Sequence, residues 1–416
     1  MKTCYVTGPT NLLGEVKISG SKNAALPILL TSILSKEPIE LHNIPVLLDT
    51  TNAMKILTKL GVKIEVKKEI YLDSSTIKNC IISNYITKKI RASIWILGPL
   101  LARCGYAKIS FPGGCKIGYR EIDLHIFGLT QLGAKITIYK NYITGSVVGK
   151  LKGTKITLSK ISVGATITIM STATLATGIT IISNAAREPE IIDLANFLNS
   201  IGAKISGAGS KKIIIKGVNK LHGGKYTIIP DRIETGTFLI AAAISNGHIV
   251  CYNTKPNLLA YFLKKLIQTG AKIKAGNDWI SLNMVNIHPK AINITTSPYP
   301  GFPTDMQAQF TLLNIISHGT SKITETIFEN RFIHIPELKK MGAIVMIKNN
   351  SIFCYGVKKL NSAKIIASDL RGAASLILAG CIANGNTIIK NSNFVTRGYE
   401  SFYKKLKMIG AKIKNK

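Results

Sequence analysis

Two kinds of apolar pattern alternate along the chain, and each predicts a different kind of helix. Segments of the first kind, such as residues 91–105 and 232–247, are apolar on nearly every side, which predicts helices that are buried all round. Segments of the second kind, such as residues 52–61 and 193–202, carry apolar residues every three or four positions with polar residues between them. That spacing predicts amphipathic helices at the surface.

A short glycine phrase ends each amphipathic segment and returns at a nearly constant interval. It reads LGVKI, LGAKI, IGAKI, TGAKI, MGAIV and IGAKI, and consecutive glycines are 68 to 72 residues apart. The glycines of the phrase are Gly61, Gly133, Gly202, Gly270, Gly342 and Gly410. A glycine directly after a helix is a natural C-cap, because it adopts the left-handed conformation without strain. With the short β-branched runs between the helices, this interval predicts one βαβαββ unit copied six times, and hence an α/β protein.

The N-terminal segment is expected to complete the last copy. The first five phrases are followed by a further strand-like run, whereas the sixth stands at the end of the chain and a matching run occupies residues 3–8. We therefore expect residues 1–20 to join the sixth repeat. Three repeats would form each of two domains, residues 21–229 with the Cys115 loop, and residues 1–20 plus 230–416. Because the chain would cross between the domains twice, we expect the active site in the interdomain cleft.

The charge of the chain changes this picture little. The formal net charge is +33, which is typical of nucleic-acid-binding proteins. The lysines, however, are spread along the whole chain, with no run longer than two and no aromatic residues interleaved with them on one face. We therefore expect no nucleic-acid partner, although a non-catalytic nucleic-acid binder remains the alternative from a different functional class.

Arginine is more informative than lysine. Among the 54 basic residues only eight are arginine. A position that stays arginine in such a lysine-rich chain indicates a need for the planar, two-pronged donor that fits phosphate and carboxylate groups, and the alternative for any one of them is a structural ion pair. The eight are Arg91, Arg103, Arg120, Arg187, Arg232, Arg331, Arg371 and Arg397. As a set they indicate an anionic small-molecule substrate.

Cysteine usage and hydropathy indicate the cellular compartment in which the protein works. The seven cysteines are scattered and include no C-x-x-C pair, which argues against a disulfide framework or a zinc site and for a reducing cytosol. The N-terminus lacks the apolar core of a signal peptide. The least polar stretch, residues 165–182, is interrupted by threonines and Gly178 and predicts a buried helix and strand rather than a membrane span. We expect a cytoplasmic protein without membrane insertion, metal or cofactor.

The segments that do not repeat are the candidates for chemistry. The most distinctive is FPGGCKIGYR, residues 111–120, in which glycines and a proline surround Cys115. This composition predicts an exposed loop, and Lys116 and Arg120 favour the reactive thiolate. The other six cysteines are expected to be small buried hydrophobic residues. Further unrepeated segments stand before predicted helices, and each has a structural alternative as a cap: SGSKNAALP, FPTDMQAQ, ASDLRGAAS, FVTRGYE and NAAREPEI.

These segments resemble the enolpyruvyl transferase family, in particular its members that act on UDP-N-acetylglucosamine. The resemblance covers residues 8–410 and rests on KNAALP, RASIWILGPL, FPGGCKIGYR, SVGATITIM, NAAREPEI, PDRIETGTFL, FPTDMQAQFTLLN, ENRF and RGYE. It implies an inside-out α/β barrel of two domains, each with threefold pseudo-symmetry. It also implies transfer of the enolpyruvyl group of phosphoenolpyruvate to the 3-hydroxyl of UDP-N-acetylglucosamine through a tetrahedral intermediate. We expect a monomer without a cofactor. The alternative acceptor is shikimate 3-phosphate, whose enzymes lack the PGGC loop.

The resemblance assigns roles residue by residue. Cys115 matches the proton donor that forms a covalent adduct and is alkylated by fosfomycin, Asp305 matches the base on the sugar hydroxyl, and Lys22 matches a third catalytic group. The residues matched to phosphoenolpyruvate are Lys22, Asn23, Arg120, Arg331, Arg371 and Arg397. The residues matched to the UDP-sugar are Asn23, Arg91, Arg120, Glu121, Ile122, Asp123, Leu124, Lys160, Ser162, Val163, Gly164, Asp305 and Ile327.

Four residues depart from the family pattern without removing a catalytic group. Tyr119 and Glu121 stand where the family often has alanine and a proline, Gly372 replaces an alanine at the start of a helix, and Thr396 replaces an aspartate. We expect these changes to affect affinity and stability more than activity. Arg103 lies outside the matched motifs, so we expect Arg103→Lys to be nearly silent.

Overall fold

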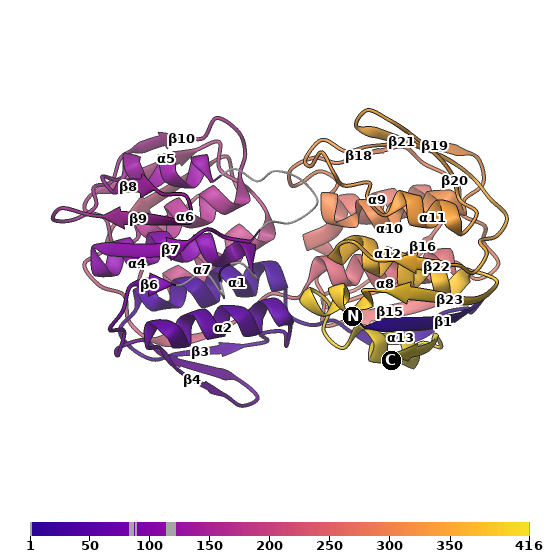
Figure 1. The fold of residues 1–416 in the computed structure, drawn as a ribbon, viewed down its shortest axis with the longest axis horizontal. Coiled ribbons are helices and arrows are strands. Elements are labelled where there is room, and N and C mark those ends of the chain that lie inside the picture. The colour runs from indigo at the N-terminus through magenta and orange to yellow at the C-terminus, as the bar shows by residue number, and fades with distance from the viewer. Residues whose placement is uncertain (1, 83–86, 88–89, 114–121, 416) are drawn as a thin grey trace. The chain divides into compact units, whose positions relative to one another are not determined.

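The computed structural model describes residues 2–82, 87, 90–113 and 122–415 of the 416-residue chain (Figure 1). The chain forms two compact units that divide after Ser19 and after Ile229. The first unit contains the described residues between 20 and 229, and the second contains those of 1–19 and 230–416. Each has its own hydrophobic core.

The described part of the first unit contains three four-stranded sheets, with strand orders β14-β3-β5-β4, β6-β7-β9-β8 and β10-β11-β13-β12. The strands are β3 Ile39–His42, β4 Lys63–Val66, β5 Ile70–Asp73, β6 Ile81–Ile82, β7 Tyr106–Ser110, β8 Lys135–Ile138, β9 Tyr142–Ser146, β10 Lys155–Thr157, β11 Ile179–Ser183, β12 Lys204–Ser206, β13 Lys212–Lys216 and β14 Gly224–Thr227. The helices are α1 Lys22–Thr31, η1 Ser32–Leu34, α2 Leu48–Leu60, η2 Arg91–Ile96, α4 Leu97–Cys104, α5 Asp123–Gln131, α6 Val163–Ala173 and α7 Pro189–Ser200.

The described part of the second unit also contains three four-stranded sheets, with orders β2-β15-β17-β16, β18-β19-β21-β20 and β22-β23-β1-β24. The strands are β1 Thr3–Gly8, β2 Leu13–Lys17, β15 His248–Tyr252, β16 Lys272–Ala275, β17 Trp279–Asn283, β18 Ile294–Thr295, β19 Thr320–Thr324, β20 Ile344–Lys348, β21 Ser351–Tyr355, β22 Lys364–Ile366, β23 Gly385–Lys390 and β24 Lys412–Asn415. The helices are α8 Arg232–Ile244, η3 Pro256–Leu259, α9 Ala260–Gln268, η4 Thr304–Met306, α10 Gln307–Ile315, α11 Ile335–Lys340, α12 Leu370–Ile382, η5 Ser392–Arg397 and α13 Phe402–Met408.

All of these sheets have the same internal pattern. The first strand is parallel to the second, and the third and fourth follow in antiparallel pairing. In the sheet β10-β11-β13-β12, for example, Lys155 is opposite Ile181 in the parallel pair, and Thr180 is opposite Ile215 in the antiparallel pair. Because the first two strands are parallel, their C-terminal ends lie on the same side of the sheet. The connections to the following helices start there.

The two N-terminal strands join different sheets. β1 lies between β23 and β24, with Cys4 opposite both Ile389 and Asn415, and Figure 1 shows this indigo strand among the yellow C-terminal strands. β2 instead pairs in parallel with β15. The expectation that residues 1–20 would together join the last repeat is therefore wrong for β2. An alternating pattern predicts a strand, but the tertiary structure decides which neighbouring strand supplies its hydrogen-bond partners.

Burial confirms the distinction between the two kinds of helix. All thirteen residues of α8 are buried, whereas only Phe262, Leu263 and Leu266 are buried in α9. Strands such as β13 alternate between buried and exposed residues, so these sheets cover the buried helices with one face and turn the other face to solvent. The stretch at residues 165–182 forms most of α6 and β11, as expected.

The glycine phrases end their helices as predicted. The six phrase glycines have φ between 93° and 103°, which is the left-handed region that a C-cap requires. A side chain at these positions would be strained whatever space surrounds it.

Arg103 has a structural role that the sequence did not indicate. Its Nη1 donates to the carbonyl oxygens of Ile33 and Ser35 and to Oγ of Ser74, and its Nη2 donates to the carbonyl oxygen of Ser74. One guanidinium thus joins the end of α4 to the end of η1 and to the turn after β5. Arg103→Lys is therefore still predicted to be nearly silent in catalysis, whereas the structure leads us to expect a loss of stability.

Candidate active site

Three predicted site residues meet at the helix starts of the second unit. Asp305 lies in η4 directly before α10, and Arg371 lies in the first turn of α12, which packs against α10. Nη2 of Arg371 donates to Oδ2 of Asp305 at 2.8 Å, and Nη2 of Arg331 donates to Oδ1 at 2.6 Å. The two arginines therefore hold one carboxylate between them, although they are 66 and 26 residues away from it in the chain.

The arginines carry more donor capacity than Asp305 uses. Their side chains are each 4% exposed, whereas the side chain of Asp305 is 28% exposed. In the described part of the chain, Nε of Arg331 and Nη1 of Arg371 are buried and have no hydrogen-bond partner. Buried polar groups are nearly always hydrogen-bonded in folded proteins. The site therefore offers two donors and an excess positive charge to an anion.

Residues that the sequence analysis missed support Arg371. The Tyr399 ring lies 5.3 Å from the guanidinium, and its hydroxyl is 3.0 Å from Nε2 of Gln309 and 3.1 Å from Oγ1 of Thr237. Burial disfavours the charged form of Arg371, but the negative charges around it, Asp305 first among them, together outweigh burial and raise the pKa of Arg371. The RGYE and FPTDMQAQ motifs contain Tyr399 and Gln309, but no local pattern indicates that their side chains meet.

The segment that carries Arg331 is held by a buried carboxylate. Glu325 is 3% exposed, and its Oε1 accepts from the backbone N–H of Ile327 at 2.8 Å. Next to Arg331, burial lowers the pKa of His334 to about 4, so this histidine is neutral. The neutral form adds no further positive charge to the arginine pair.

Three more residues of the second unit concern the sequence predictions. Gly372 and Thr396 depart from the family pattern, and Arg397 is a predicted site arginine. A Cβ at Gly372 would lie 2.5 Å from Oδ2 of Asp369, the carboxylate that caps α12, and 3.0 Å from Cβ of His334. Glycine avoids this crowding at the helix start. Thr396 is exposed and donates to the carbonyl oxygen of Asn393 at 2.8 Å, and Arg397 ends η5 directly after it.

In the first unit, Lys22 and Asn23 open the buried helix α1, and Arg91 opens η2, which packs against it. Nζ of Lys22 lies 3.6 Å from Oδ2 of Asp49, and its side chain is 12% exposed. The carboxylate holds the ammonium close to the helix start.

Three elements that carry residues matched to the UDP-sugar, η2, α5 and α6, approach one another at Gly164. A Cβ there would lie 2.9 Å from Nε2 of His125 and 3.1 Å from Nε1 of Trp95, so the close approach of η2, α5 and α6 requires glycine. Ser162 caps α6 by accepting from the backbone N–H of Ala165 at 3.2 Å. Burial, together with the charge of Arg91, lowers the pKa of His125 to about 4. The described residues matched to the UDP-sugar are Asn23, Arg91, Ile122, Asp123, Leu124, Lys160, Ser162, Val163 and Gly164 in the first unit, and Asp305 and Ile327 in the second.

Several predicted site residues lie outside the described residues. These are Cys115, Arg120 and Glu121, together with the departure at Tyr119. Four of the other cysteines, Cys4, Cys251, Cys354 and Cys381, are buried as expected, whereas Cys80 is partly exposed and Cys104 is exposed. Burial raises the pKa of the Cys4, Cys354 and Cys381 thiols to about 12, so these cysteines are unreactive hydrophobic residues.

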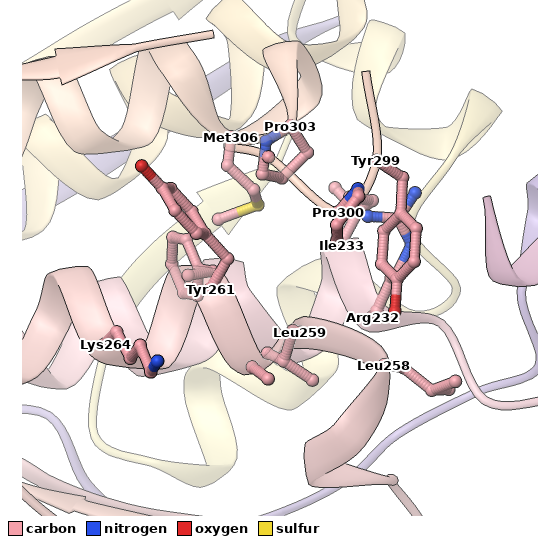
Figure 2. Close-up of a pocket in the computed structure, with 13 residues that line it drawn as sticks. Arg232, Ile233, Leu258, Leu259, Tyr261, Lys264, Tyr299, Pro300, Pro303 and Met306 are labelled. Carbon is pink, nitrogen blue, oxygen red and sulfur yellow. The ribbon is translucent and has the colours of Figure 1, made fainter. Parts of the chain in front are cut away.

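A cavity of about 180 Å³ borders the turn that carries Asp305 (Figure 2). Pro303 and Met306 line it from that turn, and Arg232, Tyr261 and Tyr299 line it from other segments. The guanidinium of Arg232, at the start of α8, lies 5.7 Å from the centre of the Tyr299 ring. Arg232 thus stands at the start of the buried helix α8. Asp305 stands just before the buried helix α10, and Arg371 at the start of α12.

Within the described ranges, no group of three His, Cys, Asp or Glu side chains is arranged to hold a metal ion, and no helix is both long and apolar enough to cross a membrane.

Comparison with known proteins identifies the family. A family model described as EPSP synthase (3-phosphoshikimate 1-carboxyvinyltransferase) matches residues 6–406. The chain is 69% identical over 416 residues to UDP-N-acetylglucosamine 1-carboxyvinyltransferase of Buchnera aphidicola subsp. Baizongia pistaciae, covering 100% of both chains. It is 56% identical to the protein of the same name from Pectobacterium carotovorum subsp. carotovorum, covering 98% of this chain and 97% of that one. The chain belongs to the enolpyruvyl transferase family. The resemblance inferred from the motifs is thereby confirmed.

Solved structures of enolpyruvyl transferases share the fold. The enolpyruvyl transferase NikO from Streptomyces tendae matches with a TM-score of 0.90 at 21% identity, covering 100% of this chain and 98% of that one. An EPSP synthase from Acinetobacter baumannii matches with a TM-score of 0.78 at 17% identity, covering 100% and 99%. The chain thus has the mixed α/β fold with many small sheets that these enolpyruvyl transferases have.

Proposed function

We propose that this enolpyruvyl transferase transfers the enolpyruvyl group of phosphoenolpyruvate to the 3-hydroxyl of UDP-N-acetylglucosamine and releases phosphate, the first committed step of peptidoglycan synthesis. Relatives at 55% to 69% identity over nearly the whole chain carry the name of this activity. The observation that carries the proposal is the carboxylate of Asp305, held by two buried arginines that each keep one nitrogen without a hydrogen-bond partner among the described residues.

Asp305 is the proposed base. Both of its oxygens accept hydrogen bonds from arginines, which is the behaviour of an ionised carboxylate, and its side chain is 28% exposed. An ionised and accessible carboxylate can take the proton from the sugar 3-hydroxyl as the hydroxyl oxygen attacks C2 of phosphoenolpyruvate. The arginines fix the direction in which the carboxylate faces, so it needs little reorganisation during the reaction.

The anionic groups of phosphoenolpyruvate are assigned to the basic residues. Arg331 and Arg371 are proposed to bind the carboxylate through their uncommitted N–H groups. Lys22, Arg120 and Arg397 are proposed to bind the phosphate, with Asn23 beside them. Planar guanidinium groups bind carboxylate and phosphate through two parallel hydrogen bonds, which also orient the substrate.

Cys115 is the proposed proton donor. Addition of the sugar oxygen at C2 requires a proton at C3, which gives a tetrahedral intermediate, and loss of phosphate with removal of a C3 proton then gives the enol ether product. Cys115 is also the proposed site of the covalent adduct and of alkylation by fosfomycin. This assignment rests on the PGGC loop of the sequence.

The UDP-sugar is assigned to one edge of the first unit. The residues proposed to bind it there, or to belong to the flanking loop, are Asn23, Arg91, Arg120, Glu121, Ile122, Asp123, Leu124, Lys160, Ser162, Val163 and Gly164. Asp305 and Ile327 of the second unit are proposed to bind the sugar end. The start of α6 offers backbone N–H groups to an anion, which suits the diphosphate.

The finer architecture is also a proposal. The common strand pattern of the described sheets supports six βαβαββ repeats in two pseudo-threefold domains, residues 21–229 and residues 1–20 plus 230–416, as an inside-out barrel. An interdomain active site, a monomeric state, a cytoplasmic location and the absence of a nucleic-acid partner remain predictions of the sequence.

Phosphate release from phosphoenolpyruvate tests the function. We expect release that depends on UDP-N-acetylglucosamine and does not occur with shikimate 3-phosphate. Release that depends on shikimate 3-phosphate alone would establish the alternative acceptor. A salt-sensitive shift of DNA without turnover of the UDP-sugar would instead establish a nucleic-acid binder.

A further inference from the structure

The candidate site residues of the second unit all come from one kind of place in the sheets. They lie in the connections that leave the C-terminal ends of the two parallel strands. Asp305 and Arg371 follow the first strands β18 and β22, and Arg331 and Arg397 follow the second strands β19 and β23. The corresponding connection after β11 in the first unit contains Arg187, to which the proposed function gives no role.

Hydrogen bonds tie the connection after β11 to the start of α6. Nδ2 of Asn184 donates to the carbonyl oxygen of Leu158 at 2.9 Å, and the backbone N–H of Ala186 donates to Oγ1 of Thr166 at 3.1 Å. Oγ1 of Thr166 in turn donates to the carbonyl oxygen of Ser162 at 2.8 Å. Arg187 therefore directly follows a segment fixed against residues 158–166, the stretch that contains the proposed diphosphate-binding helix start.

The guanidinium of Arg187 has an unexplained donor. Its Nε is buried, and within the described ranges it has no hydrogen-bond partner. The same holds for one nitrogen of Arg331 and one of Arg371, the two arginines that hold Asp305. Arg103 is different, because its donors are used by three carbonyl oxygens and a hydroxyl. A buried N–H without a partner is costly, so Arg187 has the signature of a ligand-binding arginine rather than that of a structural one.

We infer that Arg187 binds an oxygen of the diphosphate of the UDP-sugar. This inference rests on the proposed function, because the neighbouring residues 160–164 are assigned to that substrate. A diphosphate supplies the charged oxygens that a guanidinium fork fits, and a lysine-rich chain has kept arginine at this position. The inference adds one specific contact to the phosphate end of the substrate.

Binding of UDP and of uridine to the full chain tests this contact, because the two ligands differ only in the diphosphate. By isothermal titration calorimetry, Arg187→Gln should weaken UDP binding by about 10- to 100-fold, the size of one lost charge-assisted hydrogen bond. It should leave uridine binding unchanged. Arg187→Lys keeps the charge but lacks the fork, and it should weaken UDP binding by less.

Lys204→Gln is the matched control. Lys204 is exposed on β12 of the same sheet, so its replacement removes the same charge and should leave UDP binding unchanged. Equal weakening of UDP and uridine by Arg187→Gln would mean a general disturbance and would overturn the inference, as would unchanged UDP affinity. If Arg187→Gln does not fold, wild-type UDP affinity in Arg187→Lys with no loss at all overturns it. Absence of UDP binding by the unaltered chain would overturn the proposed function as well.

Discussion

Arg371 donates from Nη2 to Oδ2 of Asp305 at 2.8 Å, although the two residues are 66 positions apart and belong to different helices. Arg331 donates to the other oxygen of the same carboxylate. The proposed base and the proposed carboxylate-binding arginines thus form a single hydrogen-bonded group. A change at any member is expected to disturb the others, so effects of paired substitutions should not be additive.

Arg371→Lys should reduce kcat/KM for phosphoenolpyruvate by about 10- to 100-fold, because lysine keeps the charge but cannot contact Asp305 and the substrate with one planar fork. Arg120→Lys and Arg397→Lys should have effects of the same order. Steady-state kinetics of phosphate release at varied phosphoenolpyruvate concentration measures this.

Arg103→Lys is the control for these variants. It should leave kcat/KM nearly unchanged but lower the free energy of unfolding by roughly 1–3 kcal/mol, because several carbonyl oxygens lose their donor. Small and equal kinetic effects at all four positions would mean that the arginines act only as charges, and the site assignment would have to be rebuilt.

Cys115→Ser should lose phosphate release and resist inactivation by fosfomycin, because a serine hydroxyl is a poor proton donor and a poor nucleophile. Cys115→Asp should keep some turnover, since a carboxyl group can also give a proton. Mass spectrometry of the treated protein locates the label. Labelling of Cys104, which is exposed, instead of Cys115 would contradict the loop assignment.

His125 and His334 should make the protein less stable in mild acid. Burial lowers the pKa of each from 6.5 to about 4, so between these values the unfolded chain binds protons that the folded chain does not. Their contribution is complete above pH 6.5 and is lost as the pH falls towards 4, by roughly 3 kcal/mol for each histidine. Urea unfolding at a series of pH values measures the free energy of unfolding.

The pH dependence of the free energy of unfolding has to be compared between variants, because buried Glu234 changes the stability of the wild type with pH in the opposite direction. Burial raises its pKa to about 7 despite the charge of Lys405, so its contribution falls as the pH rises from 4.5 to 7. His125→Asn should lose part of the acid dependence of the wild type, whereas His288→Gln, at an exposed position, should keep all of it. An unchanged dependence in His125→Asn would contradict the buried neutral state.

Deletion of residues 1–8 should prevent cooperative folding of the second unit. β1 is an interior strand, and its removal leaves the hydrogen-bonding groups of both β23 and β24 without partners. A milder test is Val6→Ala, which should lower the free energy of unfolding by roughly 2 kcal/mol because Val6 is fully buried. Thr7→Ala, at an exposed position of the same strand, should cost clearly less. Unchanged thermal stability after the deletion would contradict the observed pairing.

The sequence alone determined the elements and the family. Apolar spacing distinguished fully buried helices such as α8 from amphipathic ones such as α9, and the phrase glycines marked the helix ends. These features depend on the periodicity and conformational preferences of a few neighbouring residues, which is information that a short stretch of sequence contains. The unrepeated motifs then identified the family and the candidate site residues.

Only the tertiary structure decided which distant segments meet. It placed β2 beside β15, gave Arg103 a structural role, and brought Tyr399 and Gln309 together behind Arg371. It also separated arginines with satisfied donors from Arg187, Arg331 and Arg371, which retain buried N–H groups. Such contacts join residues tens to hundreds of positions apart, and the free energy that selects them comes from packing and hydrogen bonding across the whole unit. No local pattern in the sequence records that choice.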